Sequence, residues 1–137
     1  MSTHRIHNGL GASERLQLRK QIETLFRCGE AFSVFPLRII YSLLPVASEL
    51  ESPVRVGFSI PKKKVKKAVH RNRIRRLLKE AWRLHKHDLY AAIPPGKQLH
   101  VFLVFTGTES LTFTTAVATV KGAQHRLKEL LRKNTQL

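Results

Sequence analysis

The side chains with the clearest chemistry in this sequence are the cations of one short block. Twelve of the 25 lysines and arginines lie between Lys62 and Lys86, a stretch whose one acid is Glu80. Arginine forks onto phosphate oxygens and lysine places a point charge beside them. Binding is then driven by the release of counterions from the polyanion. The block therefore predicts contacts with the phosphate backbone of a nucleic acid.

The same block has the periodicity of an amphipathic helix, which we expect over about 69–90. At about 100° per residue, one side carries apolar residues and the other carries cations. The apolar side comprises Ile74, Leu77, Leu78, Ala81 and Leu84, and the cationic side comprises Arg75, Arg76, Lys79, Arg83 and Lys86. The alternative is an ordinary solvated face, but such faces mix both signs because like charges repel at i,i+4. We therefore favour a phosphate-binding face.

Catalytic side chains are much harder to find in this chain. A metal-dependent nuclease needs convergent carboxylates, whereas the sequence has one aspartate, Asp88, and eight scattered glutamates. His85 and His87 are two residues apart on a helix and do not share a face, so they are poor metal co-ligands. Cys28 is the single cysteine, which excludes an internal disulfide and a thiolate metal cluster. We predict no catalytic residue and no metal site in the protein itself.

Composition indicates one folded, basic domain. The 137 residues carry a net charge of +16, yet 42% of them are hydrophobic, so the charge does not mark a disordered tail. Nucleic acid is favoured over an acidic membrane surface as the partner. No apolar run resembles a signal peptide or a bilayer span. We therefore expect a cytoplasmic protein with no membrane partner.

The elements that must position the basic block are three helices and three strands. Residues 1–13 are expected to form a flexible basic arm, and a first helix is predicted over 14–28, with Ser13 as its N-cap and Gly29 as its stop. The Pro94-Pro95-Gly96 breaker ends the basic helix. Apolar residues at helical spacing from Ala116 to Leu131 predict a last helix. The strands are predicted over 37–44, 54–60 and 100–105, the first two as an antiparallel pair and the third as a central strand.

Alternation along the first two strands separates two faces. The face expected in the core carries Leu37, Ile39, Tyr41, Leu43, Val54, Val56, Phe58 and Ile60. The opposite, more polar face carries Arg38, Ile40, Ser42, Arg55, Gly57 and Ser59. One side of the sheet is therefore predicted to pack on helices, and the other to carry more polar groups.

Two stretches of the sequence resemble the signature of bacterial ribonuclease P proteins. They are RVGFSIPKK over 55–63 and AVHRNRIRRLLKEAWR over 68–83, and the similarity extends more weakly through Arg15-Leu16, Phe26 and Gly29 to cover about 14–131. The resemblance implies an α+β fold, an α/β sandwich of order α-β-β-β-α-β-α. Its small mixed sheet would contain a left-handed βαβ crossover and a short extra strand near 64–68. The single RNA-binding domain would span 14–133, followed by a tail over 134–137.

The resemblance also implies a function. The chain would be the protein subunit of ribonuclease P, an endoribonuclease that removes the 5′ leader of precursor tRNA. Its partners would be the catalytic RNA and precursor tRNA, with no obligatory protein partner. Catalysis would reside in the RNA with Mg²⁺, and the protein alone would bind no cofactor. The side chains expected on the catalytic RNA are Lys62, Lys63, Lys66, Lys67, Arg71, Asn72, Arg73, Arg75, Arg76, Lys79 and Arg83.

A second surface follows from the same resemblance, a cleft for the leader between the first helix and the sheet. The positions that match it are Ile22, Phe26, Arg38 and Ile40. Phe26 keeps an aromatic of the family, whereas Ile22 and Ile40 stand where aromatics are common. Plain core packing is the alternative for Leu18, Ile22 and Phe26, since any packed helix shows such an i,i+4,i+8 stripe. For the whole chain, the alternatives are a ribosomal-protein-like structural RNA binder and an independent nuclease.

Overall fold

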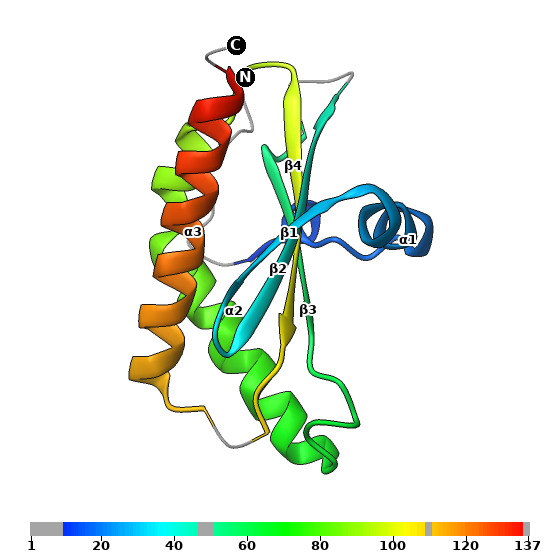
Figure 1. Cartoon of the computed structure of the whole chain (residues 1–137), viewed down its shortest axis with the longest axis vertical. Coiled ribbons are helices and arrows are strands. Elements are labelled where there is room, and N and C mark those ends of the chain that lie inside the picture. The colour runs from blue at the N-terminus through cyan, green and yellow to red at the C-terminus, as the bar shows by residue number, and fades with distance from the viewer. Residues whose placement is uncertain (1–9, 47–50, 109–110, 136–137) are drawn as a thin grey trace.

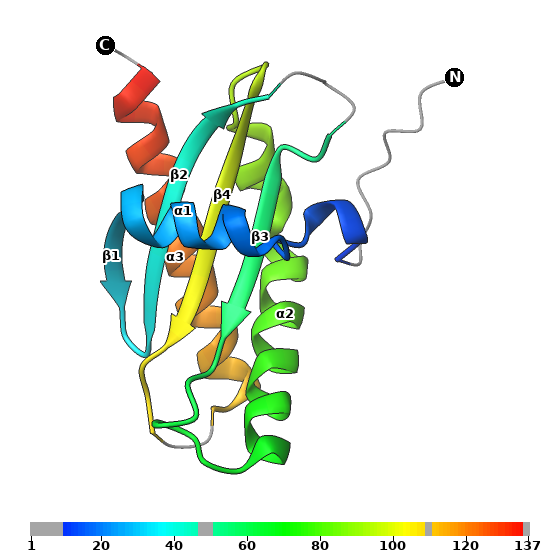
Figure 2. The ribbon, with the colours of Figure 1, turned by 90° about the vertical axis from the view of Figure 1, so that its right-hand side faces the viewer.

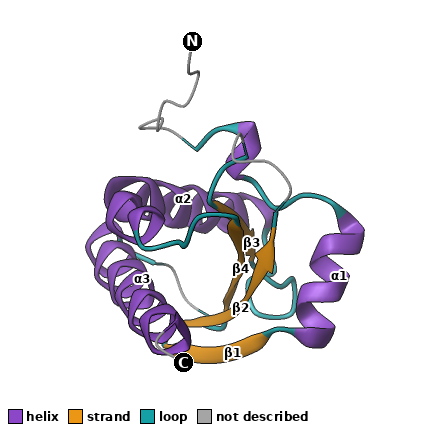
Figure 3. Cartoon of the chain, turned by 90° about the horizontal axis from the view of Figure 1, so that it is seen from above, coloured by secondary structure: helices purple, strands orange, loops and turns teal. Residues whose placement is uncertain are grey.

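A four-stranded sheet separates one helix from two others in this computed structural model, which describes residues 10–46, 51–108 and 111–135. Figure 1 shows α2 and α3 on one face of the sheet and α1 crossing the other, and Figure 3 shows the same layers from above. In chain order the elements are η1 (Ala12–Glu14), α1 (Arg19–Cys28), β1 (Glu30–Val34), β2 (Leu37–Pro45), β3 (Val54–Ser59), α2 (Ala68–Ala91), β4 (Lys97–Phe105) and α3 (Phe113–Thr135). The predicted order α-β-β-β-α-β-α is confirmed.

The strands lie in the order β1-β2-β4-β3. The predicted antiparallel pairing of 37–44 with 54–60 is wrong, because β4 lies between these strands, antiparallel to β2 and parallel to β3. β4 is the most continuously apolar strand and is buried from Gln98 to Leu103. Such a strand is most stable in the middle of a sheet covered on both sides. The expectation that 100–105 forms a central strand is confirmed.

The β3-α2-β4 unit is a crossover between neighbouring parallel strands. In Figure 2 both strands point downward, α2 returns behind them, and the chain moves from β3 to β4 in the left-handed sense. Crossovers of this kind are right-handed in about 98% of cases. The left-handed unit that the family resemblance implied is therefore present.

The extra strand that the resemblance implied is not near 64–68. Residues 62–64 form a turn, closed by the Lys64 and Val65 amides, which donate to the Pro61 carbonyl at 3.0 and 3.1 Å. The additional strand is β1, directly after Gly29, and it forms the sheet edge beside β2. Its five residues are exposed or half-buried, and so brief a pattern gives little sequence signal.

The main core lies between the sheet and the α2–α3 pair, as the strand alternation predicted. Leu37, Ile39 and Tyr41 of β2 are buried there, with Trp82 of α2 among the fully buried side chains. On the opposite face a smaller apolar cluster forms under α1, from Leu16, Leu25, Ile40 and Phe102. The predicted polar face of the strands is thus partly a second packing surface.

This second packing surface explains why Gly57 is a glycine. A Cβ at that position would lie 2.4 Å from the Phe102 ring and 3.2 Å from the Leu16 carbonyl oxygen. Leu16 also donates its amide to the Val56 carbonyl at 3.0 Å, so the chain before α1 runs along the edge of β3. Therefore α1 begins at Arg19 rather than at residue 14, and Leu18 rather than Ser13 is its N-cap. Gly29 ends α1 as predicted.

The predicted bounds of the chain ends and of α2 can be compared with the structure in the same way. Residues 1–9 of the predicted arm and 136–137 of the predicted tail lie outside the described residues, and α3 extends to Thr135. α2 extends one residue beyond the prediction at each end and departs from helical geometry at His85, with φ −125° and ψ 17°.

Candidate nucleic-acid interface

The predicted RNA contacts lie along one side of α2 and on the turn before it. We call the set Lys62, Lys63, Lys66, Lys67, Arg71, Asn72, Arg73, Arg75, Arg76, Lys79 and Arg83 the cationic face. Arg71, Arg75, Lys79 and Arg83 are half-buried, and the other seven residues are exposed. The structure therefore brings the predicted contacts into one stretch of surface.

The start of α2 holds its side chains in order before any ligand arrives. Arg71 donates from Nη1 to the carbonyls of Val65 and Lys66, at 3.0 and 2.7 Å, so it ties the lysine turn to the helix. Arg75 donates from Nη1 to Asn72 Oδ1 at 2.9 Å. Arg71 thus shapes the backbone of the turn and still presents the remaining donors of its guanidinium.

Two residues at the far end of the predicted cationic side behave differently. Arg83 pairs with Glu80, which lies one turn earlier on α2. The hydrogen bond from Arg83 lowers the pKa of Glu80, and the same bond raises the pKa of Arg83. Lys86 was predicted on the cationic side, but this is wrong, because it is fully buried and its Nζ lies 2.7 Å from Glu14 Oε1. The uncompensated positive charge is therefore greatest in the first half of α2.

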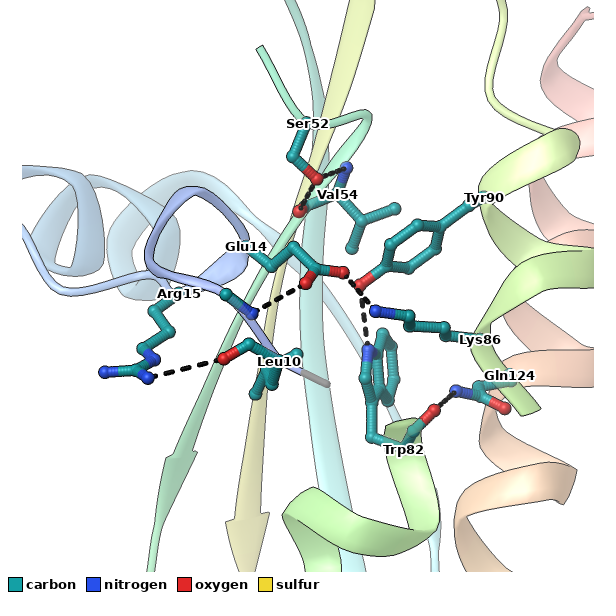
Figure 4. Close-up of polar contacts among 10 residues, drawn as sticks. Leu10, Glu14, Arg15, Ser52, Val54, Trp82, Lys86, Tyr90 and Gln124 are labelled. Carbon is teal, nitrogen blue, oxygen red and sulfur yellow. Dashed lines mark hydrogen bonds and ion pairs between the residues drawn. The ribbon is translucent and has the colours of Figure 1, made fainter. Parts of the chain in front are cut away.

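The buried Glu14–Lys86 pair connects the N-terminal segment to α2, as Figure 4 shows. The second carboxylate oxygen of Glu14 accepts the Gly11 amide at 2.8 Å. Beside the pair, Trp82 Nε1 donates to the Tyr90 hydroxyl at 3.2 Å. Burial, as the main cause, raises the pKa of Tyr90, so this phenol stays protonated. The pair fixes η1 against α2 and thereby places the residue that follows, Arg15.

Arg15 lies beside two cations of α2, Arg75 and Lys79, and was not predicted from the sequence as part of this interface. A cavity of about 140 Å³ is lined by Arg15, Arg75 and Lys79 together with β3. Burial lowers the pKa of Lys79, and the charges of Arg15 and Arg75 lower it further. Three cations held close together favour an anion such as a phosphate. The similarity at Arg15-Leu16 was the signal in the sequence, but it did not show that this segment meets α2.

The other predicted surface lies across the sheet, around α1. We call Ile22, Phe26, Arg38 and Ile40 the α1 patch. The Phe26 ring is 49% exposed and meets Phe102 edge-on, with 5.2 Å between ring centroids. Ile40 is buried beside Phe102, its register partner on β4, and Ile22 packs on the same cluster. Arg38 is exposed, so Phe26 and Arg38 are the members most available to a ligand.

Among the described residues, no three His, Cys, Asp or Glu side chains are grouped so as to hold a metal ion. A search of the same residues found no helix with the length and apolar character needed to cross a membrane.

Comparisons with known proteins agree with this arrangement. The family model for Ribonuclease P matches residues 10–134. The ribonuclease P protein component of Porphyromonas gingivalis is 42% identical over 97 residues, covering 71% of this chain and 69% of the relative. That of Chlorobaculum tepidum is 40% identical over 102 residues, covering 72% and 66%.

Solved structures show the same fold at lower sequence identity. The ribonuclease P protein of Thermotoga maritima superposes with a TM-score of 0.64 at 21% identity, covering 82% of this chain and 96% of that one. The Staphylococcus aureus protein gives 0.60 at 17% identity, covering 82% and 94%. With a matching family model and relatives at 40–42% identity, this chain belongs to the ribonuclease P protein component family, the RNA-binding protein subunits of ribonuclease P.

Proposed function

We propose that the protein binds ribonuclease P RNA through its cationic face and the 5′ leader of precursor tRNA through its α1 patch. The observation that carries the proposal is that α2, which bears most of the cationic face, and α1, which bears Phe26, lie on opposite sides of one sheet (Figure 3). A structural RNA binder of the ribosomal type needs a basic surface but has no need of a separate exposed aromatic. Membership in the family removes that alternative.

The charge distribution supports the contact with the catalytic RNA. Lys62, Lys63, Arg73 and Arg76 are exposed cations for which the described part of the chain provides no carboxylate partner. Their mutual repulsion disfavours the folded chain until an anion approaches. Phosphates of a folded RNA relieve this repulsion, and the release of their counterions favours binding.

The exposure of Phe26 supports the contact with the leader. Its edge-on contact with Phe102 fixes the ring and leaves about half of the residue open. Unpaired bases stack on such rings with about 1–3 kcal/mol per base. Arg38 on the neighbouring strand supplies a charge for the phosphates of the same strand.

The proposal assigns catalysis to Mg²⁺ ions held by the RNA. The chain has nine acidic residues in all, and Glu80 and Glu14 are engaged with Arg83 and Lys86. The work of the protein is then to hold the substrate and to neutralise RNA phosphates, which lowers the Mg²⁺ concentration that the RNA needs.

Reconstitution with a ribonuclease P RNA tests this proposal. Cleavage of precursor tRNA is measured across a Mg²⁺ titration for protein alone, RNA alone and both together. We expect no cleavage by the protein alone and a lower Mg²⁺ midpoint for the complex than for the RNA. Cleavage by protein that has been treated to remove all RNA would refute the assignment.

A further inference from the structure

A second cavity lies between the second half of α2 and the middle of α3, two helices that lie on the same face of the sheet (Figure 1). It has a volume of about 240 Å³, and only residues of these two helices line it. We call it the α2–α3 groove. A water molecule occupies about 30 Å³, so the groove has room for a small anion and several waters. Its titratable members are His85, His87, Asp88, Lys121, His125 and Lys128.

The two walls of the groove are held together by a buried contact. Gln124 of α3 is buried, and its Nε2 donates to the Trp82 carbonyl of α2 at 3.2 Å, as Figure 4 shows. On α3, the positions of Lys121, His125 and Lys128 follow i, i+4 and i+7, so these side chains lie on one face of the helix. The groove therefore presents a row of nitrogen-bearing side chains above a packed helix pair.

The wall formed by α2 adds two histidines that helical periodicity separates. On a regular helix His85 and His87 do not share a face. α2 departs from helical geometry at His85, and both side chains are exposed and line the groove. The structure thus places three histidines and two lysines around one cavity.

The charges around the groove favour an anion. Lys121 and Lys128 form no ion pair or hydrogen bond within the described part of the chain, and Asp88 is the only acid in the lining. His125 Nε2 lies 3.7 Å from Glu129 Oε1, an exposed pair of the kind that contributes little. Histidine changes its charge between about pH 5 and 8, so the groove becomes more cationic in mild acid.

We propose that the α2–α3 groove binds a phosphate group between Lys121, His125 and Lys128, with an affinity that rises as the histidines gain protons. A lysine ammonium and a protonated imidazole both donate to phosphate oxygens. At 1.5 Å per residue, His85 lies about 18 Å along α2 from Arg73, so this site is separate from the first half of α2. The phosphate belongs to an RNA strand or to a free phosphorylated small molecule, and the experiments below distinguish these two sources.

Titration of the full-length protein with sulfate, followed by NMR of the histidine rings, tests the site. Sulfate is the probe because its charge stays constant in mild acid, whereas phosphate monoesters take up a proton near about pH 6. The signals of His85, His87 and His125 are assigned from single glutamine variants. We expect sulfate to shift these signals with saturation and chloride at the same ionic strength to leave them in place. Equal shifts from both salts would overturn the proposal.

The lysines are tested by Lys121→Ala combined with Lys128→Ala, which should weaken the sulfate affinity read at His125 several-fold. Lys97→Ala combined with Lys133→Ala is the matched control, because both of those lysines are exposed and lie outside the groove. Thermal melting checks that each variant is folded. If the first variant is not, Lys128→Gln replaces it, with Lys133→Gln as its control. Equal affinities in the groove variant and its control would contradict the proposal.

The role of the histidines is tested by His85→Gln combined with His125→Gln, with sulfate binding read at His87. In the original protein the affinity should increase as pH falls from about 7.5 to 5.5, the range in which histidine gains its charge. The double variant should lose most of this increase, although it keeps Asp88, Lys121, Lys128 and Glu129. His70→Gln is the control, since His70 is exposed on α2 and lies outside the groove. The same increase in the double variant and the control would refute the role of the histidines.

The source of the phosphate is read in the reconstituted holoenzyme, from the rate at which diethyl pyrocarbonate modifies His85 and His125. If an RNA strand enters the groove, the catalytic RNA or precursor tRNA slows this modification several-fold, and the Lys121 and Lys128 variant loses the protection. If sulfate binds and neither RNA protects, the ligand is a free phosphorylated small molecule. Protection by RNA without sulfate binding would show that RNA merely covers the groove, and the proposal would fail. None of these readouts depends on the cationic face or the α1 patch, so this inference and the proposed function can fail separately.

Discussion

The cationic face and the α1 side of the sheet differ in what holds their side chains in place. On α2, cations such as Arg71 and Arg75 are ordered by neutral carbonyl and amide oxygens and keep their charge for a ligand. Around α1, the Phe26 ring rests on Phe102, and His100, which is buried and whose pKa is lowered by that burial, lies beside Leu25 and Cys28 of α1. The first region is suited to phosphates of any sequence, and the second to bases. One protein can therefore bind a structured RNA through the first surface and a single strand through the second.

The largest effect is expected from the ion pair that fixes the N-terminal segment to α2. Glu14→Ala leaves the Lys86 ammonium buried without its carboxylate, a change that costs about 3–5 kcal/mol of unfolding free energy. Urea unfolding followed by circular dichroism measures this loss. Glu23→Ala is the matched control, since Glu23 pairs with Arg19 at 3.2 Å on an exposed surface, where such pairs contribute about 0–1 kcal/mol. Similar losses in both variants would show that the buried pair has no special role.

The second prediction tests the charge of the cationic face. Arg73→Ala combined with Arg76→Ala should weaken binding to the catalytic RNA and make its salt dependence shallower by about two, roughly one for each lost phosphate contact. Affinities measured across a salt series give the slope. The protein should stay folded because both side chains are exposed. An unchanged slope would show that these arginines do not touch phosphate.

Arg71 was also expected from the sequence to contact the catalytic RNA, but the structure gives Arg71→Ala a distinct expectation. This variant should make the salt dependence of RNA binding shallower. It should also lower the melting temperature of the protein, because the Val65 and Lys66 carbonyls lose their donor. Thermal melting separates the two contributions, with the Arg73 and Arg76 variant as the reference. A melting temperature equal to that reference would show that the bonds to the turn contribute nothing.

The third prediction tests the aromatic side. Phe26→Ala should weaken binding of precursor tRNA by about 1–3 kcal/mol relative to mature tRNA, because the mature form lacks bases that can stack there. Affinities of the holoenzyme for both RNAs at one salt concentration measure the difference. Since Phe26 is 49% exposed, the loss of stability should fall below the about 3–5 kcal/mol typical of a buried phenylalanine. Equal weakening for both RNAs would remove Phe26 from the leader surface.

The two regions also differ in how far sequence could predict them. The periodicity around Ile74 predicted α2 and its charged side, since helical order is local. It could not place Lys86, because the burial of that side chain depends on Glu14, which lies 72 residues away in the chain. Strand order was missed for the same reason, as inserting β4 between β2 and β3 depends on long-range pairing. On the α1 side, Gly57 and Leu16 fix where α1 lies, and no local pattern relates those two residues.

The smallest effect concerns the buried ring of His100 and depends on pH. Burial holds the pKa of His100 below its usual value in the folded protein, so the unfolded chain binds this proton more readily. Stability from this group is therefore fully present above about pH 6.5 and falls as pH drops toward the lowered folded pKa.

His100→Gln keeps a donor for Gln98 and cannot titrate. The stability difference between the original protein and the variant should shift in favour of the variant from pH 7.5 to 5.5, by at most about 1.4 kcal/mol per pH unit. Urea unfolding at both pH values measures it, and the other six of the seven histidines cancel because both proteins carry them. A difference that stays constant would mean that His100 takes up its proton as easily in the fold as in the unfolded chain, and the α1 side would then gain a cation in mild acid.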